Sequence, residues 1–363
     1  MKAARAKARN LYGDFTGGRL DFYASVASVY SMVKAFPMSL PSVIILCPKE
    51  FKFTDATASI ETPHLAGVAN LQTVWLDFGA PLPDTVLDCH ALILWHGPQV
   101  NAEAIARMKN CRAIIRNGVG FDTVDCAAAA RAGIAVCNVP DYGTEEVADH
   151  AMTLILASWR RLVVQDQMVR KGEWAKARPM LYQFPRLMGM TLGFISFGHV
   201  ARAVARRAAP FGFQMLAYDP YIEELVMSDY GVQPVSYGEL LERSDIVSMH
   251  APGTKDAHHL MKEQHFRKMK KTALFVNTGR GSTVDEPAMI KALQEGWIAG
   301  AGLDVLETEP VGHNNPLLGM DNVILTAHVA SASSRSVPPP SARMRAPPHA
   351  GHRVSGSAAL PHP

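Results

Sequence analysis

The chain has 363 residues, of which 48 % are hydrophobic and 19 % are charged, and its formal net charge is +3. This length is too great for one ordinary hydrophobic core and predicts two domains. The small net charge argues against a polyanionic partner, and no apolar run reaches the ~18–20 residues of a membrane span. The composition therefore predicts a globular protein that binds neither nucleic acid nor membrane.

The chain opens with the basic segment MKAARAKARN, and residues 1–40 show no clear hydrophobic period. We interpret them as an N-terminal extension; a targeting peptide is the alternative, although Asp14 and Asp21 follow soon and no apolar stretch leads to a cleavage site. The cysteines are odd in number and form no C-x-x-C pair, which indicates reduced thiols in the cytoplasm. They are Cys47, Cys89, Cys111, Cys126 and Cys137.

Ordered character begins with the apolar run SVIIL at 42–46, which predicts a buried strand. Further strands are predicted at 91–95, 112–115 and 134–138, and a helix at 101–110. Alternation of strand and helix indicates a parallel sheet covered on both faces. We therefore assign residues 41–143 to a first α/β domain.

Residues 144–174 carry acids at their start, Lys and Arg at their end, and apolar residues at helical spacing. This pattern predicts one long helix that connects two domains.

A second α/β unit follows, so 144–330 is predicted to be a doubly wound nucleotide-binding domain. Its helices include 199–210 and 285–296. Its strands are predicted at 191–195, 214–218, 245–249, 273–277, 300–305 and 323–326. Beyond residue 330 the apolar period stops, and residues 331–363, rich in Pro, Ser, Ala, Arg and His, are predicted to be a disordered or divergent tail.

The segment TLGFISFGHVARAVA at 191–205 reads as a strand, turn and helix that hold a dinucleotide. The usual G-x-G-x-x-G turn is reduced to Ser196, Gly198 and Ala201. Gly198 keeps the position at which a side chain would collide with the phosphates, and alanine is accepted at the third position. If Ser196 must adopt an awkward backbone conformation, the replaced glycine costs on the order of 1 kcal/mol.

The context of this turn favours nucleotide binding, because phosphate would sit at the N-terminus of the following helix. Asp219 ends the next strand and precedes Pro220. A carboxylate there accepts hydrogen bonds from the ribose hydroxyls and repels a 2′-phosphate, which favours NAD over NADP. The alternative is that Asp219 only starts a turn.

Three polar residues in the second unit follow predicted strands: Arg280, Glu309 and His328. Each residue also has a purely structural interpretation. In it, Arg280 bonds nearby carbonyls, Glu309 is a solvated loop acid and His328 caps the sheet. Together they supply a cation for a carboxylate, a proton donor, and an acid to tune that donor. This is the set of groups needed to reduce a 2-keto acid.

From about residue 43 to 330 the chain resembles the D-isomer-specific 2-hydroxyacid dehydrogenases. The resemblance rests on several long motifs in the family's order, and two of them, IIRNGVGFDTVD and AGIAVCNVP, look most like the branch of the C-terminal-binding proteins, which are NAD-sensing corepressors. The motifs are GVGFDTVD (118–125), GIAVCNVP (133–140), EEVADHAM (145–152), MHAP (249–252), VNTGRGSTVDE (276–286), GAGLDVLETEP (300–310) and NVILTAH (322–328).

The resemblance implies an α/β fold of two doubly wound parallel sheets, a flavodoxin-like substrate domain and a Rossmann NAD domain. It implies an NAD-dependent oxidoreductase that transfers a hydride between NAD(H) and a small D-2-hydroxy acid or 2-keto acid. Arg280 would hold the substrate carboxylate, His328 would be the acid/base, and Glu309 its partner. An adjacent carboxylate favours the imidazolium form and fixes the ring.

Further contacts follow from the same resemblance. Arg116 and the backbone of Gly118 and Val119 would bind the substrate carboxylate beside Arg280. The family's dimerisation implies a homodimer. No metal site is implied, and the segment AHH at 257–259 lacks a supporting ligand pattern. The cofactor would contact Ser196, Gly198, His199, Val200, Asp219, Pro220, Thr278 and Asp304.

The tail after His328 departs from the family, whose members continue into a returning helix. Two alternatives to the dehydrogenase therefore stay open: an NAD(H)-sensing, corepressor-like scaffold, and a truncated, poorly active dehydrogenase.

Overall fold

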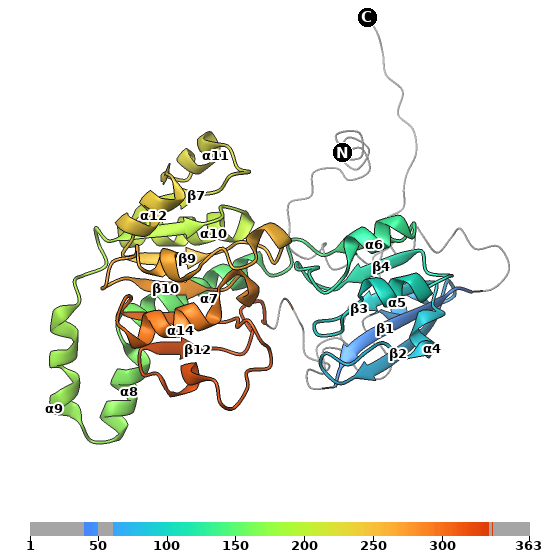
Figure 1. The fold of residues 1–363 in the computed structure, drawn as a ribbon, viewed down its shortest axis with the longest axis horizontal. Coiled ribbons are helices and arrows are strands. Elements are labelled where there is room, and N and C mark those ends of the chain that lie inside the picture. The colour runs from blue at the N-terminus through green and yellow to red at the C-terminus, as the bar shows by residue number, and fades with distance from the viewer. Residues whose placement is uncertain (1–39, 50–60, 334–335, 337–363) are drawn as a thin grey trace, which may run out of the picture.

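A computed structural model describes residues 40–49, 61–333 and 336. It contains two parallel sheets, each covered by helices, that stand side by side (Figure 1). The predicted fold class is confirmed. The predictions for the N-terminal extension and for nearly all of the tail lie outside the described residues.

The first sheet has five strands in the order β2-β1-β3-β4-β5. The helices α4, α5 and α6 cover one face and α3 the other. The strand β2 was not predicted, because Gln72 and Thr73 interrupt its apolar run at the edge of the sheet. The elements are β1 (Ser42–Pro48), α3 (Thr62–Leu65), β2 (Asn70–Leu76), α4 (Asp84–Leu87), β3 (Ala91–Leu94), α5 (Ala102–Arg107), β4 (Ala113–Arg116), α6 (Cys126–Arg131) and β5 (Ala135–Asn138).

The second sheet has seven strands in the order β12-β11-β10-β9-β6-β7-β8, all parallel. The order reverses between β6 and β9, and ligands bind at such a switch point. The predicted strands are present, and only the short edge strand β8 was missed. The strands are β6 (Thr191–Ile195), β7 (Gln214–Tyr218), β8 (Val232–Pro234), β9 (Ile246–Met249), β10 (Leu274–Asn277), β11 (Gly300–Leu303) and β12 (Val323–Leu325).

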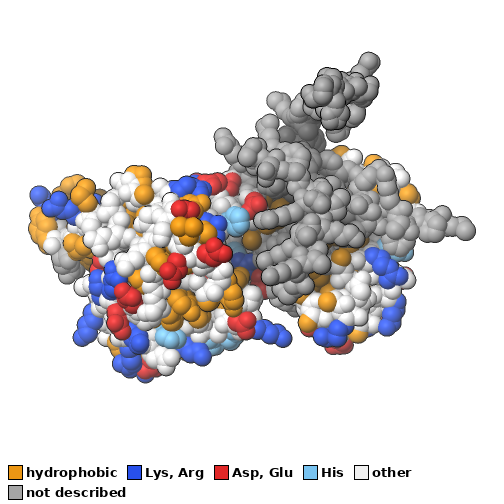
Figure 2. Space-filling model, turned by 90° about the horizontal axis from the view of Figure 1, so that it is seen from above, with side chains coloured by type: hydrophobic (Ala, Val, Ile, Leu, Met, Phe, Trp, Pro, Cys, Tyr) orange, Lys and Arg blue, Asp and Glu red, His pale blue; other side chains and the backbone are white. Residues whose placement is uncertain are grey.

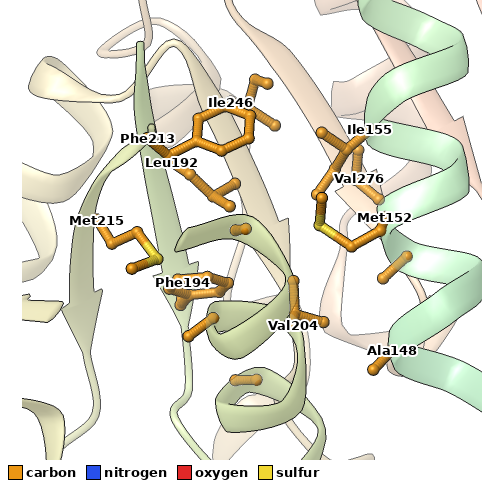
Figure 3. Close-up of a cluster of buried hydrophobic side chains, with 14 of the residues drawn as sticks. Ala148, Met152, Ile155, Leu192, Phe194, Val204, Phe213, Met215, Ile246 and Val276 are labelled. Atoms are coloured by element: carbon orange, nitrogen blue, oxygen red, sulfur yellow. The ribbon is translucent and has the colours of Figure 1, made fainter. Parts of the chain in front are cut away.

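Helices α7 and α10 pack against one face of the second sheet. Figure 3 shows Met152 and Ile155 of α7, Val204 of α10 and Phe194 of β6 in this core. Helices α12, α13 and α14 cover the other face. The helices are α7 (Thr144–Trp159), α8 (Leu162–Arg170), α9 (Trp174–Ala177), α10 (His199–Ala208), α11 (Glu224–Ser228), α12 (Tyr237–Arg243), α13 (Glu263–Phe266) and α14 (Glu286–Gln294).

The prediction of one helix over 144–174 is wrong. Helix α7 ends at Trp159, and Arg161 takes a left-handed conformation with φ 50°. The Arg161 guanidinium donates to the Ala299 carbonyl at 2.9 Å and lies over the Phe184 ring. Because α7 is held on the sheet while α8 buries none of its residues, the chain turns away at this point.

Helices α8 and α9 project from the seven-stranded domain (Figure 1). Leu162, Val169 and Trp174 on them are exposed, and Trp174 is 72 % exposed. Figure 2 shows hydrophobic side chains at this end of the molecule, beside Lys and Arg. Within the described part of the chain, no helix combines the length and apolar character needed to cross a bilayer.

Candidate active site

A cleft of about 560 Å³ is lined by residues from both domains. Its walls include the segments that follow strands β3, β4 and β5 in the first sheet and β6, β9, β10, β11 and β12 in the second. These segments follow the carboxyl ends of parallel strands, as the doubly wound fold requires. The predicted site residues that line it are Arg116, Gly118, Val119, Ser196, Gly198, His199, Val200, Thr278, Arg280, Asp304 and His328.

Glu309 lies behind His328 rather than in the cleft wall. His328 Nδ1 and Glu309 Oε2 are 2.7 Å apart, and the backbone N–H of Leu306 donates to the other carboxylate oxygen at 3.0 Å. Burial raises the pKa of Glu309, but contacts with His328 and His96 outweigh it and hold the pKa well below its usual range. The carboxylate is therefore ionised and orients the His328 ring.

The loop carrying His328 is fastened to Asp304. His328 has φ 53°, and its N–H donates to the Asp304 carbonyl at 2.8 Å. The buried Asp304 carboxylate accepts from the Thr326 hydroxyl and from the N–H groups of Val329 and Ala330. Three donors on one carboxylate hold this loop in place, so Asp304 positions His328 in addition to lining the cleft.

Arg280 reaches across to the first domain. Its Nε donates to Asp122 Oδ1 at 3.0 Å, and its Nη1 to the Gly279 carbonyl at 2.8 Å. A Cβ on Gly120 would overlap the Arg280 guanidinium, so glycine is needed there for this approach. Burial raises the pKa of Asp122, but the charge and hydrogen bond of Arg280 outweigh this effect, so the pKa lies below its usual value. The guanidinium is therefore held by an ionised carboxylate of the opposite wall.

Arg116 is 6 % exposed and lies under the loop at Gly118. Burial lowers its pKa to about 10, so it remains charged at neutral pH. Its Nε is buried and has no hydrogen-bond partner among the described residues. A buried, incompletely satisfied guanidinium at the cleft is suited to an anionic ligand.

Sequence reasoning missed two residues of this site, His96 and Asp122. His96 follows β3 and lines the cleft, with its ring centroid 4.5 Å from that of His328 and its Nε2 3.8 Å from Glu309 Oε2. Asp122 lies within the motif GVGFDTVD, which offered a signal. For His96, the only signal in the sequence was its position after an apolar strand.

The dinucleotide turn has the backbone strain expected of its substitution. Ser196 adopts φ 71°. Its hydroxyl donates to Asp219 Oδ2 at 3.1 Å, and the N–H of Phe197 donates to the same oxygen at 2.8 Å. The N–H of Tyr221 donates to Asp219 Oδ1 at 2.8 Å. Asp219 therefore fixes the turn; neither it nor the exposed Pro220 is part of the cleft wall.

The site fits a dinucleotide in three respects. A Cβ on Gly198 would meet no protein atom within 4 Å, so the protein itself does not require glycine there. Gly198 caps α10, whose first turn carries no acid and leaves backbone N–H groups for an anion. Thr278 Oγ1, buried in the cleft wall, has no partner among the described residues.

Comparisons with known proteins agree with this geometry. The family described as D-isomer specific 2-hydroxyacid dehydrogenase, NAD binding domain, matches residues 152–330. A glyoxylate reductase of Korarchaeum cryptofilum is 42 % identical over 265 residues, covering 72 % of this chain and 80 % of that protein. One from Thermococcus litoralis is 38 % identical over 268 residues, covering 72 % and 81 %.

Among solved structures, the D-lactate dehydrogenase of Aquifex aeolicus, complexed with NAD and lactic acid, superposes with a TM-score of 0.69 at 27 % identity. The match covers 84 % of this chain and 92 % of that one. The corepressor branch is not singled out by these relatives. The chain belongs to the D-isomer-specific 2-hydroxyacid dehydrogenase family and is an oxidoreductase that transfers a hydride between NAD(H) and a 2-hydroxy or 2-keto acid.

Proposed function

We propose that this dehydrogenase reduces glyoxylate or a similarly small 2-keto acid, with Arg280, His328 and Glu309 as its reactive set. The observation that carries the proposal is that Arg280 and His328 line one cleft while Glu309 contacts His328 at 2.7 Å from behind. The identity of the glyoxylate reductase relatives supports the choice of substrate.

The substrate carboxylate binds between the Arg280 guanidinium and the backbone N–H groups of Gly118 and Val119. Arg116 adds charge to this subsite. A guanidinium fork matches a carboxylate, and its field also polarises the adjacent carbonyl. Asp122 keeps Arg280 extended across the cleft, so the cation is in place before the substrate arrives.

His328 donates a proton to the carbonyl oxygen as the carbonyl carbon is reduced, and removes it in the reverse direction. Glu309 holds the ring through Nδ1, which leaves the other ring nitrogen for the substrate. NAD(H), when bound, accepts or supplies the hydride.

The predicted cofactor contacts extend from the turn to the nicotinamide end. Ser196, Gly198, His199 and Val200 are expected at the pyrophosphate, with Thr278 and Asp304 near the ring. Asp219 is expected at the ribose, although its oxygens already accept from the turn. Oδ1 accepts one hydrogen bond, from Tyr221, and keeps a lone pair for a ribose hydroxyl, and the charge of the carboxylate disfavours a 2′-phosphate.

We also expect a homodimer in the cytoplasm. Helix α8 buries none of its residues within one chain and exposes Leu162 and Val169, an apolar face suited to a second copy. All five cysteines are free, as in a reducing compartment.

The test is a panel of 2-keto acids, glyoxylate first, mixed with NADH while its absorbance is followed. Turnover of glyoxylate with NADH and little with NADPH is the expected result. NADH binding without turnover on any keto acid would overturn the proposal and favour the sensing scaffold. Failure to bind NADH would favour the impaired dehydrogenase.

A further inference from the structure

Two groups of potential metal ligands occur among the described residues: His96, Glu309 and His328 in the cleft, and His258, His259 and Glu307 outside it. We propose that the first group is an inhibitory site for a transition-metal ion such as Zn²⁺. The proposal rests on the site of the proposed function, to which it adds a metal ligand. Metal binding is measured without turnover, so its test does not depend on that function.

The distances suit a tetrahedral ion after small side-chain movements. Ligand atoms at the usual ~2.0–2.2 Å from Zn²⁺ lie roughly 3.3–3.6 Å from one another in a tetrahedron. Glu309 Oε2 is 2.7 Å from His328 Nδ1 and 3.8 Å from His96 Nε2, so the observed separations lie on either side of this value. All three ligand atoms lie within 4.8 Å of one another.

The donor set matches the chemistry of zinc. Two imidazoles and a carboxylate are a known zinc ligand set, with the fourth position left to water. About a quarter of each side chain is exposed, and the cleft beside them admits water.

The charges around the group are mixed. The Glu309 carboxylate attracts a cation, whereas the Arg116 guanidinium, which lines the same cleft as His96 and His328, repels one. A hard ion such as Mg²⁺, which prefers an all-oxygen shell, gains little from two imidazoles and would not overcome this repulsion. The site therefore selects Zn²⁺ over Mg²⁺.

Metal binding would block the acid/base group and join the domains. Coordination occupies the His328 nitrogen that faces Glu309, so the ring can no longer hold a proton there as imidazolium. His96 belongs to the first domain, whereas Glu309 and His328 belong to the second. The ion therefore links the two cleft walls.

The second group is less suited. Glu307 contacts His259 through one oxygen and accepts from the N–H of Glu286 through the other, as Glu309 does with His328 and Leu306, but this group lies outside the cleft. His258 is exposed. The second group therefore provides a matched control, because it contains the same residue types but lies outside the cleft.

The experiment is equilibrium titration of the full chain, without substrate, with Zn²⁺ and with Co²⁺, whose visible bands report tetrahedral coordination. One ion per chain is expected, with an affinity about tenfold or more lower in His96→Gln and Glu309→Gln and unchanged in His258→Gln. Mg²⁺ should not compete. Circular dichroism and NADH binding check that each variant folds.

Inhibition by Zn²⁺ is then measured for each protein against its own metal-free rate. If His96→Gln loses this inhibition as it loses Zn²⁺ binding, the result extends to catalysis. Absence of binding, or binding lost in His258→Gln but kept in His96→Gln, would overturn the proposal. If the chain binds Zn²⁺ at this site but reduces no keto acid, the metal site stands and the proposed function fails.

Discussion

The two walls of the cleft are built differently. The cofactor-side wall carries Arg280 and His328, the proposed reactive groups, and Glu309 of the same domain contacts His328 from behind. The substrate-side wall, formed by His96, Arg116, Gly120 and Asp122, acts on those groups from the other domain. The difference indicates that one wall performs the chemistry and the other sets its geometry, so changes to the first should cost more activity.

The largest effect is expected from His328→Asn. Asparagine tolerates the left-handed conformation that His328 adopts at φ 53°, so the loop should be kept while the acid/base is lost. We expect kcat to fall on the order of 10²–10⁴-fold, with NADH affinity unchanged. Steady-state kinetics and NADH fluorescence titration measure both. A variant that keeps near-normal turnover would remove His328 from the mechanism.

The next effect is expected from Gly120→Ala, which places a methyl group where the Arg280 guanidinium lies. Displacing this cation should lower kcat/KM for glyoxylate about 10²-fold. Gly312→Ala is the control, because a Cβ there meets no atom within 4 Å. Equal rates for the two variants would show that the opposite wall does not set the position of Arg280.

A smaller effect is expected from Asp122→Asn, which keeps an oxygen acceptor for Arg280 but removes the charge. The pair is partly exposed, with 23 % and 36 % of the Arg280 and Asp122 side chains accessible, so solvent weakens it. We expect kcat/KM to fall about tenfold or less, mainly through KM. A fall as large as that of His328→Asn would contradict the division between the walls.

The smallest effect is expected from Ser196→Gly. Glycine relieves the φ of 71°, but the hydrogen bond to Asp219 is lost and the unfolded chain gains freedom. The free energy of unfolding should rise by no more than ~1 kcal/mol, measured by urea denaturation. A marked destabilisation would mean that the Ser196 hydroxyl matters more to the turn than its strain.

Local pattern was enough to predict the cofactor domain. Strand β6, the turn at Gly198 and helix α10 are contiguous, so their apolar period and turn residues report the structure directly. The sequence offered an awkward backbone conformation at Ser196 only as a condition, and the structure has it, with φ 71°. Arg280, Glu309 and His328 were identified because each follows a strand of one sheet, and the carboxyl ends of parallel strands meet at one edge.

Residue pattern alone was therefore enough to predict most strands and helices and the candidate residues Arg280, Glu309 and His328, since each prediction depends on neighbours in the chain. Tertiary packing sets the break at Arg161, where contacts with Ala299 and Phe184 turn the chain away from a helical pattern. It also decided the roles of His96 and Asp122. Their partners lie in the other domain, and no local period encodes a contact between residues so far apart in sequence.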